Sequence, residues 1–111
     1  MSDDGKYNGY TNYETWAVKL WIDNDQPSQE YWLEGARISL TEAPDNGDPG
    51  TIFTREERAT FDLADALKEW HEENTPSAFG VFADLLNASL GRVDWQEIAT
   101  SLIADAAEIP A

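Results

Sequence analysis

The stretch Asn8–Asp25 reads NGYTNYETWAVKLWIDND and is the strongest structural signal in this chain of 111 residues. Stepped at about 100° per residue, its apolar side chains cover most of a helix circumference. One polar stripe interrupts them: Thr15, Lys19 and Asp23. A helix that is apolar over most of its surface is normally buried on several sides. The stretch therefore predicts a central N-terminal helix, Asn12 to Asn24, with Trp16 and Trp21 in the core.

Both ends of this predicted helix carry boundary signals. Thr11 and Glu14 fit a capping box, in which a hydroxyl and a carboxylate each bond a free backbone N–H group. At the other end, the segment Asp23–Pro27 ends the helix, because proline disfavours helical backbone at the residue before it. Ahead of the helix, Tyr7–Tyr10 has the composition of a turn that leads into the cap.

Two further helices are predicted before residue 74. Ser28 can cap the first of them, which extends from Gln29 to Glu42. The segment Ala43–Phe53 is rich in turn-forming residues and predicts a loop. A second capping box, at Thr54–Glu57, then opens a helix that ends near Glu73.

The last part of the chain predicts two more helices. Thr75–Pro76 places proline at the favoured first position of a helix that stops at Gly91. Asp94 and Glu97 form a third capping box by position and open the final helix. Six apolar residues of that helix share one side: Trp95, Ile98, Ala99, Leu102, Ile103 and Ala106.

The predicted fold is all-α, a compact bundle of about five short helices around the central N-terminal helix. Residues 1–6 predict a disordered acidic arm, and residues 7–111 a single helical domain. The sequence contains neither an internal repeat nor the strict alternation typical of strands.

The charge balance is the most unusual property of the composition. The chain has 22 Asp and Glu against seven Lys and Arg, which gives a net charge of −15. Such a surface repels nucleic-acid phosphates and anionic membranes. We therefore expect no direct binding to nucleic acid or membrane, and a basic protein as the partner. A carboxylate excess with few lysines is also typical of proteins in molar salt, where screening makes self-repulsion tolerable, and this alternative stays open.

The absence of cysteine excludes disulfides and thiolate metal ligands, which favours a cytoplasmic protein. The polar, acidic start of the sequence is unlike a signal peptide. No apolar run approaches the ~18 residues that a membrane span needs.

No motif for catalysis or metal binding is complete. His71 and Glu72 open a zinc-type H-E-x-x-H pattern, but residue 75 is Thr, so the sole histidine is interpreted as a surface residue of a helix. Residues 45–56 have the length of a calcium loop, but Gly47 and Pro49 stand where oxygen ligands are required. A Ser-His-Asp triad stays open, although no nucleophile elbow occurs. We expect no enzyme activity, no metal and no cofactor.

Two surfaces are candidates for protein binding. The first is an acidic stripe on the helix that ends near Glu73, and its members are Asp62, Asp65, Glu69 and Glu72. Such a stripe is usually a solvated helix face, so both interpretations stay open. The second is the turn formed by Tyr7, Asn8, Gly9 and Tyr10. Aromatic and amide groups in an exposed turn suit protein recognition, but these residues also fit a hydrophobic staple that closes the helix start.

Three stretches carry a resemblance to a known group of proteins: Asn8–Asp25, DLADALKEW at Asp62–Trp70, and VDWQEIATSLIAD at Val93–Asp105. The first resembles the NGYTNYETW-type signature of a family of small uncharacterised proteins encoded by phages, plasmids and other mobile elements of bacteria and archaea. The resemblance covers most of the chain apart from the acidic arm and the loop. It implies a mobile-element context, in which genes of this size often encode inhibitors of host defence.

Two classes of function follow. In the first, the protein is an acidic protein-binding domain that mimics DNA and inhibits a host nucleic-acid-handling or defence protein. In the second, it is a non-enzymatic structural or adaptor domain whose acidity reflects a high-salt cytoplasm. Carboxylates clustered on one face favour the first class, and even spacing favours the second. The sequence does not specify the oligomeric state.

Overall fold

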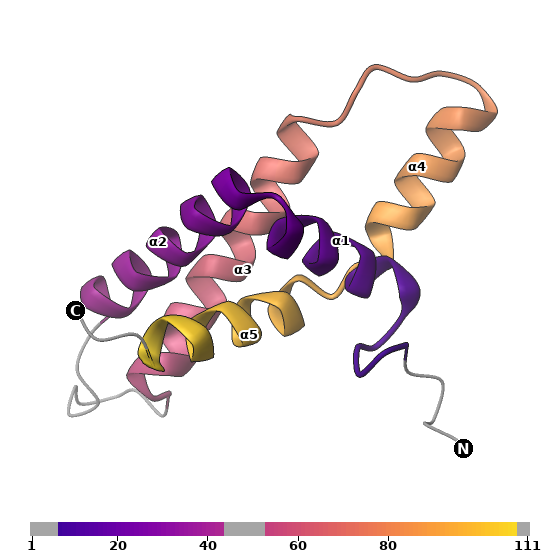
Figure 1. The fold of residues 1–111 in the computed structure, drawn as a ribbon. Helices are drawn as coiled ribbons and strands as arrows, with labels where there is room; N and C mark the ends of the chain where they lie inside the picture. Colours follow the sequence, from indigo (N-terminus) through magenta and orange to yellow (C-terminus); the bar gives the residue numbers. More distant parts are fainter. Residues whose placement is uncertain (1–6, 44–52, 109–111) are drawn as a thin grey trace.

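A computed structural model describes residues 7–43 and 53–108, and in these ranges every regular element is an α-helix. The helices are α1 (Tyr13–Asn24), α2 (Gln26–Glu42), α3 (Arg55–Glu73), α4 (Val81–Gly91) and α5 (Trp95–Glu108) (Figure 1). The prediction of an all-α fold is confirmed. The acidic arm predicted at residues 1–6 and most of the predicted loop lie outside the described residues.

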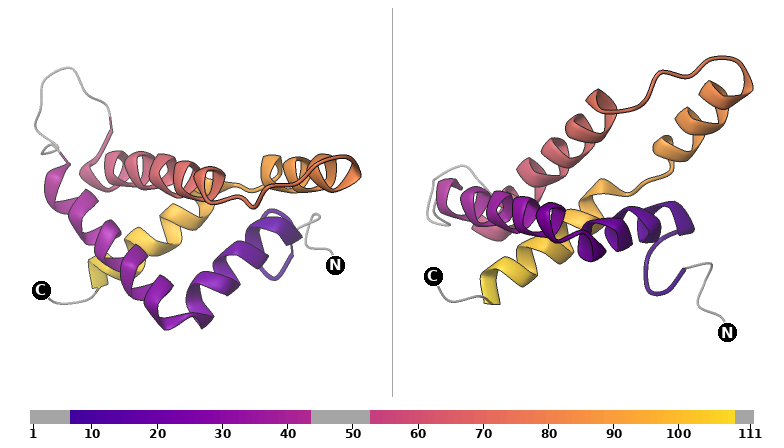
Figure 2. Two further views of the ribbon diagram at one scale, coloured as in Figure 1. Left: turned by 90° about the horizontal axis from the view of Figure 1, so that it is seen from above. Right: turned by 45° about the horizontal axis from the view of Figure 1, so that its top comes forward.

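The centre of the bundle is α5, which packs against α3 and α2, with α1 close to its beginning (Figures 1 and 2). The residues that α5 buries are the six predicted for one side, from Trp95 to Ala106. They meet Trp32 and Ala36 of α2 and Leu63 and Leu67 of α3 in one hydrophobic core. The single apolar stripe of α5 thus packs against two neighbouring helices, α2 and α3.

The prediction that α1 is the central helix is wrong. Trp21 is 75% exposed, and Trp16 is only half-buried. The polar stripe points inward instead, since Thr15 and Lys19 are buried. The ammonium of Lys19 is neutralised there by both carboxylate oxygens of Asp23, at 2.8 and 2.7 Å. A polar side chain can be buried when a partner satisfies it, so polarity alone did not reveal which face of α1 is inside.

Several predicted helix starts are also corrected by hydrogen bonds. The N-cap of α1 is Asn12, whose side-chain oxygen accepts from the N–H of Thr15, so the capping box of Thr11 with Glu14 does not form. The N-cap of α2 is Asp25 rather than Ser28, and Pro27 lies inside its first turn. These are competitions between neighbouring cap-forming side chains, which sequence spacing does not resolve.

The other two predicted capping boxes behave differently. Thr54 and Glu57 form the complete reciprocal pair, with N–H···O distances of 2.8 and 3.1 Å. Asp94 caps the N–H of Glu97 at 3.1 Å, but the return bond is missing because the N–H of Asp94 donates to Thr15. The first box is confirmed, and the second is only half formed.

The course of the chain between α3 and α4 differs from the prediction. Residues 75–79 are extended rather than helical, and α4 begins at Val81 after Gly80, whose φ of 65° favours glycine. Proline at position 76 therefore does not start the helix. This segment carries α4 away from the core, as an arm that projects from the bundle (Figure 1).

Candidate interaction surfaces

The acidic face of α3 consists of Asp62, Asp65, Glu69 and Glu72, and all four side chains are exposed. Along a helix with a rise of about 1.5 Å per residue they extend over about 15 Å. The same helix carries three further exposed carboxylates: Glu56, Glu57 and Glu73. Its inner face holds the buried Leu63 and Leu67. Solvent exposure and helical spacing thus place the four predicted residues on one accessible surface.

Carboxylates are not confined to α3. Exposed acids lie also on α1, α2 and α5, among them Asp23, Glu30, Glu42, Asp105 and Glu108. By contrast, α4 carries one charged residue, Asp84. The acidic surface therefore covers several sides of the bundle, is densest on α3, and leaves out α4.

The turn at Tyr7–Tyr10 is closed by two backbone hydrogen bonds, from Tyr7 N–H to Tyr10 C=O at 2.7 Å and the reverse at 2.8 Å. Both central residues have positive φ, 49° for Asn8 and 89° for Gly9, as a tight two-residue turn requires. The ring of Tyr7 packs against Tyr13 and Trp16, at centroid distances of 5.2 and 4.9 Å.

The residues of this turn differ in how far they are exposed. Asn8 and Gly9 are exposed and available to a partner, whereas the Tyr7 ring, although 41% exposed, is held against the first turn of α1. Aromatic contacts of this kind stabilise the entry into a helix by about 0.5–1.5 kcal/mol each beyond the area that they bury.

A hydrogen-bond network that the sequence did not predict joins the start of α1 to the start of α5. The hydroxyl of Thr15 donates to the side-chain oxygen of Asn12 at 2.7 Å and accepts from the N–H of Asp94 at 2.8 Å. The N–H of Thr11 donates to Glu97 at 2.9 Å. The Asn12 amide donates to the C=O of Arg92 at 2.7 Å. The polar residues of the N-terminal stretch therefore cap two helices and dock them together.

One ion pair lies beside this junction. Arg92 contacts Glu14 at 3.2 Å. Hydrogen bonding to its own backbone, with a smaller contribution from Arg92, holds the pKa of Glu14 below its ordinary value. A functional role is not needed to explain these charges, since they close the junction between α1 and α5.

His71 is surrounded by indole rings. It stacks on Trp32 at 6.1 Å and also contacts Trp70 and Trp95, at 4.8 and 4.9 Å. Its Nδ1 lies 2.7 Å from the C=O of Leu67, and since a carbonyl only accepts, Nδ1 carries the proton. Burial lowers the pKa of His71, because desolvation disfavours the charged ring. The prediction that His71 is a surface residue is thus corrected: its side chain is half-buried and packs at the edge of the core.

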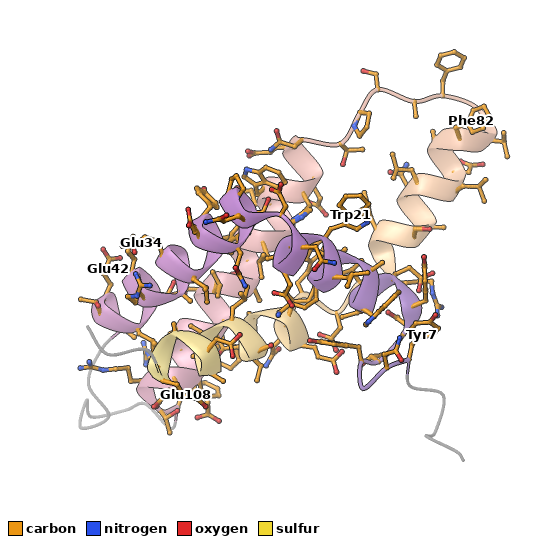
Figure 3. All side chains as sticks on the ribbon, in the orientation of Figure 1. Tyr7, Trp21, Glu34, Glu42, Phe82 and Glu108 are labelled. Atoms are coloured by element: carbon orange, nitrogen blue, oxygen red, sulfur yellow. The ribbon has the colours of Figure 1, made fainter. Side chains whose placement is uncertain are left out.

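An apolar cleft lies between α1 and α4. It encloses about 260 Å³ and is lined by residues of both helices and the link to α5: Tyr13, Glu14, Ala17, Val18, Leu86, Ser89, Leu90 and Val93. The exposed rings of Trp21 and Phe82 lie further out on the two helices (Figure 3). The sequence pattern of α1 predicted a core helix, so it gave no indication of this surface.

Among the described residues, no group of acidic, histidine or cysteine side chains is arranged to hold a metal ion. None of the described helices has the length and apolar character needed to cross a membrane. Most of the rejected calcium loop, residues 45–52, lies outside the part of the chain that the structure describes.

The fold and surfaces define a small acidic all-α domain. The model of a family of unknown function, DUF7249, matches residues 3–109, and the chain belongs to that family. No curated protein and no solved structure matches the chain.

Proposed function

We propose that the protein is a non-enzymatic, acidic protein-binding domain of the cytoplasm, and that its α3 acidic face binds a basic protein that handles nucleic acid. The observation that carries this proposal is the exposure of four carboxylates on one side of a single helix. Opposite charges steer association, so such a surface gives fast, salt-dependent binding.

DNA is the natural ligand of such a partner, so its charge density is the quantity that a mimic has to match. Over the ~15 Å spanned by the acidic face, duplex DNA presents about nine phosphates, one per ~1.7 Å of axis. Four carboxylates supply somewhat less than half of this charge, and the exposed carboxylates at both ends of α3 add to it. We therefore expect competition between this protein and DNA for the same basic surface, with inhibition of the partner as the consequence.

The resemblance of the N-terminal stretch to proteins of phages, plasmids and other mobile elements supports a narrower form of the proposal. In that context the basic partner is a host defence or nucleic-acid-processing protein. The turn at Tyr7–Tyr10 then offers a second contact, through the exposed Asn8 and Gly9.

The test begins with a pull-down from host extract, followed by binding measurements on the captured protein. Neutralising the acidic face with Asp62→Asn, Asp65→Asn, Glu69→Gln and Glu72→Gln should leave the helical circular dichroism unchanged, because all four side chains are exposed. Binding at low salt should weaken by about tenfold or more, which corresponds to about 1.4 kcal/mol. Duplex DNA should displace the parent protein from the partner.

A matched control separates position from net charge. Glu30→Gln, Glu42→Gln, Asp105→Asn and Glu108→Gln also remove four exposed charges, on α2 and α5, and both variants change the net charge from −15 to −11. The control should bind nearly as tightly as the parent. If both variants weaken equally, or if DNA does not compete, the α3 face is not the binding surface.

The spread of exposed carboxylates over α2 and α5 favours a second candidate, an adaptor or structural domain adapted to high salt. Screening by salt relieves repulsion among surface charges, so stability should then rise steeply with salt. A thermal melt in about 0.1 M and about 2 M KCl measures this. Unfolding at the lower concentration would favour the second candidate over mimicry.

A further inference from the structure

Helix α4 is mainly apolar, with Asp84 and Asn87 together on one side, yet none of its residues is buried. Its exposed side chains include Val81, Phe82 and Leu85, and Phe79 just before it is 88% exposed. A helix with a wide apolar surface normally buries that surface against protein. In the described chain α1 approaches its last turns at the α1/α4 cleft, and Lys68 and Glu72 of α3 face those turns across a second pocket. Most of the surface of α4 therefore lacks a cover.

The ribbons of α1 and α4 together form a V (Figures 1 and 2). The two helices are closest where α1 begins and α4 ends, and they diverge from there (Figures 1 and 2). Along α1, Trp21 follows the cleft-lining Ala17 and Val18 at helical spacing, and along α4, Phe82 precedes Leu86 by one turn.

The size of this surface matches an interface. Seven exposed apolar residues make it up: Tyr13, Leu20, Trp21, Phe79, Val81, Phe82 and Leu85. With about 200 Å² for a full aromatic side chain and somewhat less for an aliphatic one, their exposed fractions amount to roughly 800 Å². That is comparable to the ~800 Å² that each partner buries in a standard interface, so a partner that covered these residues together would bury an area typical of a stable complex.

We propose that a second copy of this chain covers the surface, with α4 of each copy lying in the α1/α4 cleft of the other. Each copy thus carries both the α1/α4 cleft and an apolar helix, α4, that can occupy the cleft of its partner. A two-fold axis then satisfies both copies with the same set of contacts, as closed dimers require. The result is an antiparallel or crossed group of four helices, α1 and α4 from each copy.

The few charges near the α1/α4 cleft favour a second copy of this chain over a basic protein as its occupant. The only charged residue of α4 is Asp84, and the carboxylate of Glu14 at the cleft is already paired with Arg92. The surface thus lacks the carboxylates that would attract a basic protein, and its own copy adds little repulsion there. Salt should strengthen this dimer by screening the remaining negative charge, whereas it should weaken the partner binding proposed above. The opposite effects of salt therefore distinguish the dimer from the binding of a basic partner, and either proposal can be wrong without the other.

Sedimentation velocity over a range of protein concentrations tests the dimer. In about 1 M KCl the parent should approach twice the chain mass of 12.4 kDa, with a Kd of about 1–100 µM. The double variant Phe82→Asp/Leu85→Asp should remain a monomer at every concentration. Both side chains are more than 60% exposed, so the monomer should keep its helical circular dichroism.

The matched control is Tyr31→Asp/Ile38→Asp, which places the same charges at exposed apolar positions of α2. It should dimerise as the parent does. The proposal is overturned if the parent stays monomeric at about 1 mM, where even a Kd of about 1 mM would show. It is equally overturned if the α4 variant dimerises unchanged, or if the α2 control alone abolishes the dimer.

Discussion

Helices α4 and α5 follow each other in the chain, and both are mainly apolar, yet their surroundings are opposite. Six residues of α5 are buried, while α4 has none. In α5 the apolar residues share one stripe, and alanines at 99 and 106 allow close approach of its neighbours. In α4 they spread over a wide arc that leaves out the side of Asp84 and Asn87, and a non-helical segment holds the helix away from the core. Whether a helix is buried is therefore decided by how its apolar residues are arranged and by the segments that connect it to the core. The number of its apolar residues does not decide this.

The largest expected difference between the two helices is in the free energy of unfolding. Leu102→Ala in α5 removes a side chain that is 1% exposed, and should cost about 2–5 kcal/mol through lost burial and the cavity left behind. Leu85→Ala in α4 should change the stability of the monomer by less than about 0.5 kcal/mol, because the side chain is 61% exposed. Urea denaturation of the two variants, at a protein concentration too low for self-association, compares these two losses of stability. Equal losses would contradict the assignment of α4 as an uncovered arm.

The next effect concerns the junction between the start of α1 and the start of α5. Thr15→Val keeps the shape of the side chain but removes the hydroxyl that accepts from the N–H of Asp94. An unsatisfied buried group costs about 1–3 kcal/mol, and the same loss is expected in the free energy of unfolding. Thr100→Val is the control, since its exposed hydroxyl bonds only its own helix, to the C=O of Gln96. A loss no larger than that of the control would show that the network does not stabilise the start of α5.

The smallest effect is a pH dependence at the beginning of α5, where Trp95 packs on His71. The folded-state pKa of His71 lies below its unfolded value of 6.5, so the unfolded chain takes up the proton first as pH falls. The contribution of the neutral ring is complete above pH 6.5 and is lost as pH falls through the folded pKa.

The comparison variant for this pH dependence is His71→Phe, which keeps an aromatic ring without a titrating group. Acidification also protonates carboxylates, but both proteins share these, so the difference between their stabilities isolates the histidine. Chemical denaturation at pH 7 and pH 5 should show the parent losing stability relative to the variant. A constant difference over this range would contradict the lowered pKa.

The predicted elements that hold in the structure depend on local rules. The buried stripe of α5 follows from a helical period of apolar residues, and the pairing of Thr54 with Glu57 satisfies two N–H groups within one turn. The exposure of Asp62, Asp65, Glu69 and Glu72 follows in the same way, since they lie opposite Leu63 and Leu67. Whether that face binds a partner remains a prediction.

The error about the buried face of α1 concerns residues whose partners are distant in sequence. Thr15 bonds Asp94, 79 positions away, and Thr11 bonds Glu97, 86 positions away. Those bonds turn the polar stripe of α1 inward and leave Trp21 outside. No periodicity within α1 contains that information, because a stripe of polar residues fits solvent and a satisfied interior equally well.

The sequence by itself determined the all-α class, the number of helices in the described chain, the inner face of α5 and the acidic surface, because each depends on neighbours within a few turns. Only the tertiary structure decided which helix is central, which face of α1 is buried and that α4 stands apart. These depend on competition between whole helices for one small core, in which α5 offers one coherent stripe and long-range hydrogen bonds turn the aromatic side of α1 toward solvent.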